Sequence, residues 1–144
     1  MRIMLINGPN LNLLGRREPG LYGDKTLAQI EADLAGEGRK LGIEVTCFQS
    51  NIEGELVNAI QKAGLEMDGA ILNAGAYTHT SVALRDAAAG VPAPIVEVHL
   101  TNPAAREDFR KVSLLAGAVA GSISGFGAES YFLALLWFSR GKKD

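Results

Sequence analysis

The segment Ile3-Met4-Leu5-Ile6-Asn7-Gly8-Pro9-Asn10 (residues 3–10) carries the pattern that decides the fold, a short apolar run that ends in a polar turn with glycine and proline. Its apolar residues are consecutive rather than alternating, which is typical of a parallel strand covered on both faces. Outward from this segment, four more strand-like runs follow, at Ile43–Phe48, Ala70–Leu72, Ile95–Leu100 and about Val119–Ile123.

Helix signals fill the intervals between these runs. Thr26 and Gln29 form a capping-box pattern ahead of apolar residues at helical spacing. Ser50 and Glu53 repeat this pattern, and Thr80 is expected to cap a third helix that ends before Gly90-Val91-Pro92. The fourth and fifth helices are predicted over Ala105–Val112 and Glu129–Arg140.

The alternation of five strands with five helices favours an open α/β sheet with right-handed crossovers. We predict a flavodoxin-like parallel sheet of strand order 2-1-3-4-5, with helices on both faces. The 144 residues show no linker, repeat or low-complexity tract, so residues 1–144 are interpreted as a single catalytic domain.

The composition is that of an ordinary soluble globular protein, with 47% hydrophobic and 21% charged residues. A net charge of −2 gives no electrostatic reason to expect a nucleic acid or an anionic membrane as partner. The single cysteine, Cys47, fits a reducing compartment because it cannot form an internal disulfide. The longest apolar run, near Tyr131–Phe138, is far shorter than the ~20 residues that span a bilayer. We therefore expect a cytoplasmic protein.

The same run, Tyr131–Phe138, predicts a final helix that is apolar all the way round. One interpretation is a helix packed on the sheet with some excess hydrophobicity. We favour a helix whose outer face another subunit covers, because a monomer would expose an aromatic patch there.

Polar and glycine-rich residues gather where the predicted strands end, in residues 7–12, 49–51, 73–79 and 97–102. Sites in open α/β sheets form beyond the carboxyl ends of the strands. These segments contain both histidines of the chain, His79 and His99, which indicates a functional site at this edge.

The segment from Gly8 to Lys25 is longer than the usual connection between a strand and a helix, and residues 16–23 are interpreted as an active-site lid. Tyr22 and Arg17 in this segment suggest a general base. A free phenol has a pKa of about 10, and a neighbouring guanidinium lowers that pKa. The alternative is a solvated surface loop with scattered charges.

Glu97 and His99 are two residues apart on a predicted strand, so their side chains point to the same face. The carboxylate can accept a hydrogen bond from the imidazole, which fixes the tautomer of the ring and favours its protonated form. This arrangement suits a general acid. The alternative is a buried pair that only satisfies its own hydrogen bonds.

Two further groups of residues suggest ligand binding. The loop from Asn73 to His79 leads into a predicted helix N-terminus, which suits ring hydroxyls and anions. Arg106 and Arg110 are four residues apart and face one way on the predicted helix. Arg110 can reach a substrate carboxylate or hydroxyl, whereas Arg106 equally fits surface pairs with the neighbouring acids.

Four blocks of the sequence, in order and at compatible spacing, resemble the type II dehydroquinase family. They are residues 7–19 (NGPNLNLLGRREP) with Tyr22-Gly23, residues 73–86 (NAGAYTHTSVALRD), residues 97–100 (EVHL) and residues 106–110 (REDFR). The resemblance covers nearly the whole chain. It implies a flavodoxin-like fold and a dehydration of 3-dehydroquinate to 3-dehydroshikimate through an enolate, in the shikimate pathway of aromatic amino acid biosynthesis, without cofactor or metal.

The resemblance also implies a role for each residue. Tyr22, with Arg17 lowering its pKa, takes the proton beside the ketone, and Asn10 stabilises the enolate through a water. His99, held by Glu97, protonates the departing hydroxyl. The implied substrate-binding residues are Asn73 and the backbone near Leu100 and Thr101 for the carboxylate, His79 and Arg110 for ring hydroxyls, and Asp86 from a neighbouring subunit. The family assembles as trimers that associate into dodecamers.

Thr101, Pro103 and Ala104 depart from the family pattern, which often has serine, an aliphatic residue and histidine there. Thr101 keeps the hydroxyl and the backbone amide, so carboxylate binding is expected to survive. The alternatives to this enzyme are a flavodoxin-like small-ligand-binding module without catalysis, a hydrolase built on Ser81, His79 and Asp86, and a metal enzyme that uses His79, His99 and Glu97.

Overall fold

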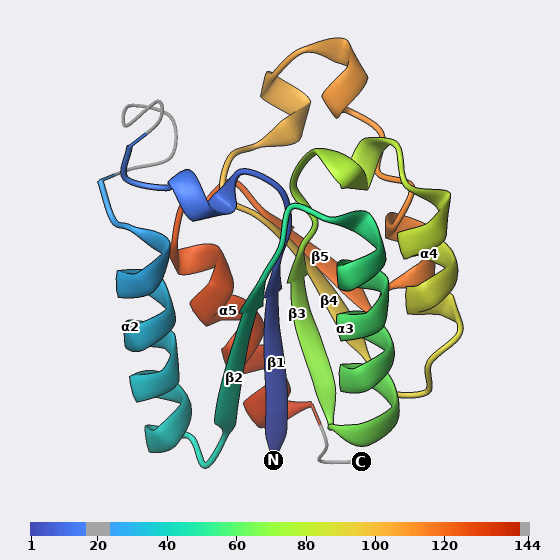
Figure 1. Cartoon of the computed structure of the whole chain (residues 1–144). Coiled ribbons are helices and arrows are strands. Elements are labelled where there is room, and N and C mark those ends of the chain that lie inside the picture. The colour runs from blue at the N-terminus through green and yellow to red at the C-terminus, as the bar shows by residue number, and fades with distance from the viewer. Residues whose placement is uncertain (17–23, 142–144) are drawn as a thin grey trace.

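The structure, a computed structural model, describes residues 1–16 and 24–141. Its centre is a parallel sheet of five strands in the order β2-β1-β3-β4-β5, which confirms the predicted order (Figure 1). The strands are β1 (Arg2–Asn7), β2 (Glu44–Gln49), β3 (Gly69–Asn73), β4 (Ile95–His99) and β5 (Gly121–Ser124).

Four α-helices cover the two faces of the sheet in the described part of the chain: α2 (Leu27–Lys40), α3 (Glu53–Glu66), α4 (Val82–Ala89) and α5 (Glu129–Arg140). Helices α2 and α5 lie on one face and α3 and α4 on the other (Figure 1). Strand β1 shows the division, because Ile3 and Leu5 pack into the α2/α5 core and Met4 and Ile6 into the α3/α4 core. Both faces of the strand are buried, as its continuous apolar run predicts.

The helix starts agree with the sequence prediction in one case and differ in two. The Thr26 hydroxyl accepts from Gln29 N, and Gln29 Oε1 accepts from Thr26 N, so this capping box is confirmed. The predicted capping box of Ser50 and Glu53 is wrong, because Ile52 occupies the N-cap position of α3. The Ser50 hydroxyl instead accepts from Ile52 N and donates to Glu55 in the first turn of the helix. Ser81, not Thr80, caps α4 by accepting from Leu84 N at 3.0 Å.

The predicted helix over Ala105–Val112 is wrong. The structure has two short 3₁₀ turns, Pro103–Ala105 and Asp108–Arg110, separated by extended backbone at Arg106. Phe109 and Val112 are both 65% exposed, so this segment has no apolar face that packs on the sheet. A short helix without such packing is marginal in water.

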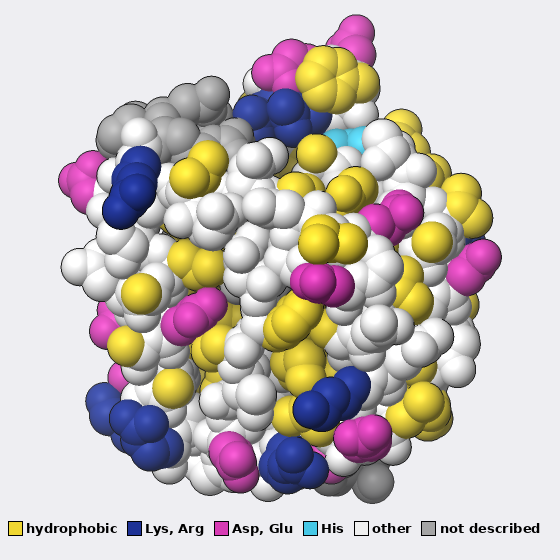
Figure 2. All heavy atoms as spheres, in the orientation of Figure 1, with side chains coloured by type: hydrophobic (Ala, Val, Ile, Leu, Met, Phe, Trp, Pro, Cys, Tyr) yellow, Lys and Arg dark blue, Asp and Glu magenta, His cyan; other side chains and the backbone are white. Residues whose placement is uncertain are grey.

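Helix α5 buries Tyr131, Leu135 and Phe138 against the sheet but exposes apolar side chains on its outer face, with Leu133 41% and Trp137 43% exposed. That a second subunit covers this face stays a prediction. Elsewhere on the surface, acidic, basic and apolar side chains are interspersed over the face that Figure 2 shows. None of the described helices is both long and apolar enough to cross a bilayer.

Candidate active site

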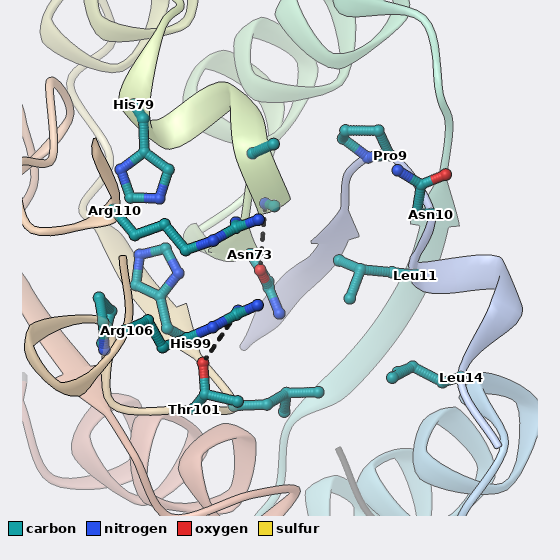
Figure 3. A pocket seen from close by; sticks show the side chains of 14 residues that line it. Pro9, Asn10, Leu11, Leu14, Asn73, His79, His99, Thr101, Arg106 and Arg110 are labelled. Atoms are coloured by element: carbon teal, nitrogen blue, oxygen red, sulfur yellow. Dashed lines mark hydrogen bonds between the residues drawn. The ribbon is translucent and has the colours of Figure 1, made fainter. Parts of the chain in front are cut away.

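Three loops meet beyond the carboxyl ends of the central strands and enclose a pocket (Figure 3). The loop after β1 and the loop after β3 are in close contact, because a Cβ added to Gly8 would lie 2.5 Å from the carbonyl oxygen of Ala74. Only glycine allows this approach. The pocket is lined by Pro9, Asn10, Leu11 and Leu14 after β1, by Asn73, Gly75, Ala76 and His79 after β3, and by His99, Leu100, Thr101, Pro103, Arg106 and Arg110 at and after β4.

The structure brings together most of the residues that the sequence analysis singled out. Seven of the eleven residues that were given a catalytic or binding role line the pocket: Asn10, Asn73, His79, His99, Leu100, Thr101 and Arg110. Glu97 lies beside His99 and lines a second cavity next to the pocket. Asp86 is exposed on α4 and lines a groove with α3 residues, away from the pocket of its own chain. Arg17 and Tyr22, with the rest of the predicted lid except Arg16, lie outside the described residues.

Glu97 is a buried carboxylate, 1% exposed, that accepts four hydroxyl or imidazole donors. Thr78 and Ser122 donate to it, Ser113 donates to both oxygens, and Nε2 of His99 lies 3.0 Å from Oε2. Burial raises the pKa of Glu97, but the hydrogen bonds from His99, Thr78 and Ser113 and the charge of His99 outweigh burial and lower this pKa to about 2. The carboxylate is therefore ionised at neutral pH.

The ionised Glu97 fixes the tautomer of His99. A carboxylate only accepts hydrogen bonds, so Nε2 of His99 carries a proton and donates a hydrogen bond to Glu97. The other ring nitrogen, Nδ1, is then the one that exchanges a proton with a ligand. Because His99 lines the pocket, the pair has the geometry of an oriented proton donor.

His79 is oriented by a backbone carbonyl rather than by a carboxylate. Its Nδ1 lies 2.7 Å from the carbonyl oxygen of Val112, which can only accept, so Nδ1 carries a proton. This leaves Nε2 of His79 for a ligand. The two histidines of the site are thus held in different tautomers by different partners.

Arg106 and Arg110 both line the pocket although they do not share an α-helix, and Figure 3 shows both guanidinium groups reaching toward Asn73. Arg106 Nη1 donates to the Thr101 hydroxyl at 3.4 Å. Arg110 Nε donates to the exposed carboxylate of Glu107. Two guanidinium groups and two imidazoles in one pocket suit an anionic, hydroxylated ligand.

One hydrogen bond fixes the side chain of Asn73, and another fixes the backbone of Asn10. Oδ1 of Asn73 accepts from Gly75 N at 3.2 Å, which fixes which way the amide faces (Figure 3). Asn10 has a φ of 68°, in the left-handed region that asparagine tolerates better than most residues, and its backbone N–H donates to Asn51 Oδ1 at 2.9 Å.

Several residues that support the site have no role predicted from the sequence. Ser113 and Ser122, which hold Glu97, stand outside the segments that end strands, so strand pattern does not point to them. The sequence places Tyr131 only in an apolar helix, yet its hydroxyl forms hydrogen bonds with both Asn7 and Asn73. A tyrosine in a helix that packs on the sheet was the available signal, because a buried phenol usually has a hydrogen-bond partner.

Comparisons with known proteins agree with the fold. A 3-dehydroquinate dehydratase of Synechococcus sp. (strain CC9902) is 58% identical over 135 residues, which are 94% of this chain and 92% of that protein. A second, from Prochlorococcus marinus, is also 58% identical and covers 94% of this chain and 91% of its own. The crystal structure of a type II dehydroquinase from Propionibacterium acnes matches with a TM-score of 0.94 at 40% identity, over 96% of both chains.

A 3-dehydroquinate dehydratase-like protein from Bifidobacterium longum is more distant, with a TM-score of 0.74 at 31% identity over 97% of this chain and 96% of its own. The profile of the family described as dehydroquinase class II matches residues 1–139, nearly the whole sequence. The strand order of the sheet agrees with this match. The chain therefore belongs to the class II dehydroquinase family.

Proposed function

We propose that this chain is a 3-dehydroquinate dehydratase, a hydro-lyase that converts 3-dehydroquinate into 3-dehydroshikimate in the shikimate pathway. The observation that carries the proposal is the Glu97–His99 pair at a pocket with two arginines, in a member of the class II dehydroquinase family. The two relatives that are named 3-dehydroquinate dehydratase match this chain over almost their whole length.

The reaction removes water from a β-hydroxy ketone in two steps. Tyr22, as phenolate beside Arg17, takes a proton from the carbon next to the ketone, and the electron pair of that C–H bond moves to give an enolate. Asn10 stabilises the enolate oxygen through a water. These roles rest on the family motif, since Arg17 and Tyr22 lie outside the described residues.

In the second step the enolate re-forms the ketone and expels the β-hydroxyl, so that a carbon–carbon double bond forms as the C–O bond breaks. His99 gives its proton to the departing oxygen, which leaves as water. Glu97 supports this step because its ionised carboxylate accepts from Nε2 of His99 and holds the ring in one orientation at the pocket.

The remaining polar groups of the pocket hold the substrate. Asn73 and the backbone near Leu100 and Thr101 bind its carboxylate, and His79 and Arg110 bind its ring hydroxyls. Support comes from their common position around the pocket and from the backbone hydrogen bonds that fix the Asn73 amide and the His79 ring. Binding groups held in one geometry lose little entropy when the substrate arrives.

The active unit is an oligomer in which Asp86 of one subunit reaches the pocket of its neighbour. Two observations support this proposal. Asp86 is exposed and away from its own pocket, and α5 carries exposed Leu133 and Trp137. The family analogy gives trimers assembled into a dodecamer. The composition, the single cysteine and the length of the chain favour a cytoplasmic enzyme with a single catalytic domain.

The alternatives gain little support from the geometry. Ser81, the nucleophile of the hydrolase alternative, is 2% exposed and caps α4. Among the described residues, no three His, Cys, Asp or Glu side chains form a group that could hold a metal, so the set of His79, His99 and Glu97 is not such a group. The binding-module alternative is left to experiment.

The test is to mix the purified protein with 3-dehydroquinate and follow the ultraviolet absorbance of the conjugated product. We expect activity that persists after treatment with borohydride and substrate, since no lysine Schiff base takes part, and that collapses in Tyr22→Phe. A folded, oligomeric wild-type protein that gives a flat trace would reject the enzyme and favour the binding module.

A further inference from the structure

Tyr131, in the first turn of α5, lies beneath the pocket and connects the ends of two strands. Its side chain is fully buried, and its hydroxyl lies between the side chains of Asn7 on β1 and Asn73 on β3. Asn7 and Asn73 are direct partners in the parallel pairing of these strands. The helix therefore contacts the sheet at the point where the loops that line the pocket begin.

The direction of the hydrogen bonds around Tyr131 is determined by their partners. Oδ1 of Asn73 is occupied by Gly75 N, so Nδ2 of Asn73 faces Tyr131 and donates to its hydroxyl at 3.0 Å. The hydroxyl in turn donates a hydrogen bond to Oδ1 of Asn7. Burial raises the pKa of Tyr131, so the hydroxyl keeps its proton at neutral pH. An amide has two N–H bonds, and the second one of Asn73 stays available at the pocket that Asn73 lines.

This arrangement leaves a buried polar group unpaired within the described part of the chain. Nδ2 of Asn7 is buried and has no hydrogen-bond partner within residues 1–16 and 24–141. An unpaired buried amide lowers stability, whereas apolar side chains of the same shape are close to neutral. The hydrogen-bonded group of Asn7, Tyr131 and Asn73 lies directly beneath the pocket and lowers the stability of the core through this unpaired amide, which points to a role in the site.

We propose that Tyr131 is a positioning residue that fixes the amide of Asn73 so that one N–H faces the carboxylate of the bound substrate. Tyr131 does not line the pocket and acts only through Asn73. The inference rests on the proposed role of Asn73 in carboxylate binding and adds the residue that sets the orientation of that amide.

Tyr131→Phe removes only the hydroxyl and leaves the ring in the core. We expect the KM for 3-dehydroquinate to rise about tenfold while kcat stays within about twofold, because an interaction made equally in the ground and transition states is lost. Phe138→Leu is the matched control, since Phe138 is also buried in α5 but belongs to the apolar core. It should lower the thermal midpoint without raising KM.

The double variant Tyr131→Phe with Asn73→Ala separates a local effect from general loosening. If Tyr131 acts through Asn73, the double variant has the same KM as Asn73→Ala alone. Asn7→Ala keeps the tyrosine and removes the acceptor of its hydroxyl, so it should also raise KM. This variant replaces Tyr131→Phe in the test if Tyr131→Phe does not fold.

The outcomes distinguish this inference from the function on which it rests. A raised KM in Asn73→Ala with an unchanged KM in Tyr131→Phe overturns the positioning role alone. An unchanged KM in Asn73→Ala overturns both the binding role of Asn73 and the positioning role of Tyr131. A double variant much worse than Asn73→Ala shows that Tyr131 acts elsewhere and also rejects the inference.

Discussion

Ser113 donates its hydroxyl hydrogen toward both carboxylate oxygens of Glu97, at 3.0 and 2.8 Å, from a loop sixteen residues further along the chain. The same hydroxyl oxygen accepts from the backbone N–H groups of Leu115 and Ala116. The loop after the 3₁₀ turns is therefore attached to the carboxylate that orients His99. A change in this loop reaches the proposed proton donor through two hydrogen-bonded side chains.

Ser113→Ala should lower kcat more than it changes KM. Glu97 loses its Ser113 donor, so its carboxylate holds His99 less firmly, and we expect kcat to fall about tenfold. Two backbone N–H groups also lose their acceptor, which costs about 1–3 kcal/mol of stability. Steady-state kinetics and denaturant unfolding measure the two effects. Ser124→Ala is the control, because Ser124 lines the same cavity as Ser113 and is not hydrogen-bonded to Glu97; equal kinetics in the two variants would contradict the prediction.

The stability of the protein should fall at acidic pH through Glu97. Its pKa is about 2 in the folded protein, against an ordinary value of 4.5. Because the folded value is the lower one, the stabilisation is complete above pH 4.5 and is lost as the pH falls toward 2. The contribution is on the order of 3 kcal/mol.

Glu97→Gln provides the measurement of this pH effect. The difference in unfolding free energy between wild type and Glu97→Gln should shrink between pH 4.5 and pH 2, because the variant has no carboxylate to protonate at this position. Asp33→Asn, at an exposed surface ion pair with Lys25, is the control and should show little such change. A difference that is independent of pH would contradict the assignment.

His99→Asn should abolish most turnover while leaving binding largely intact. Asparagine still donates to Glu97, so the buried carboxylate keeps a partner, but no group remains to protonate the leaving hydroxyl. The expected fall in kcat is about 10²- to 10⁴-fold, as for other general acids. In contrast, His79→Asn should mainly raise KM, because His79 is proposed to bind ring hydroxyls. The prediction fails if the two variants show the same pattern of kcat and KM.

The sequence predicted the centre of the sheet because β1 and β3 are continuous apolar runs that are buried on both faces, and few other structures fit such runs. The segment Ala105–Val112 was misjudged for the opposite reason. Its residues have helical spacing, but Phe109 and Val112 stay largely exposed within the described part of the chain, and the backbone turns twice without forming an α-helix. Periodicity predicts structure only where a packing partner exists.

Some contacts of the site could likewise be predicted from the sequence, and others could not. Glu97 and His99 could be paired from sequence because strand geometry alone places them on one face. The partners Ser113 and Tyr131 come from distant segments, and only the folded chain brings them within hydrogen-bond distance of Glu97 and Asn73. Local spacing carries no information about such contacts.

The proposed position of Asp86 in a neighbouring pocket gives the last prediction, which uses two inactive variants. Asp86→Ala chains have an intact His99, and His99→Asn chains have an intact Asp86. When the two are unfolded, mixed in equal amounts and refolded together, a pocket built from both chains can combine the two intact residues. Random association then restores about one quarter of the wild-type sites, since each residue is intact with a probability of about one half. Each variant refolded alone, and the two mixed without unfolding, are the controls. Activity that does not rise above these controls, in mixtures shown to contain hybrid oligomers, would mean that Asp86 acts within its own chain or not at all.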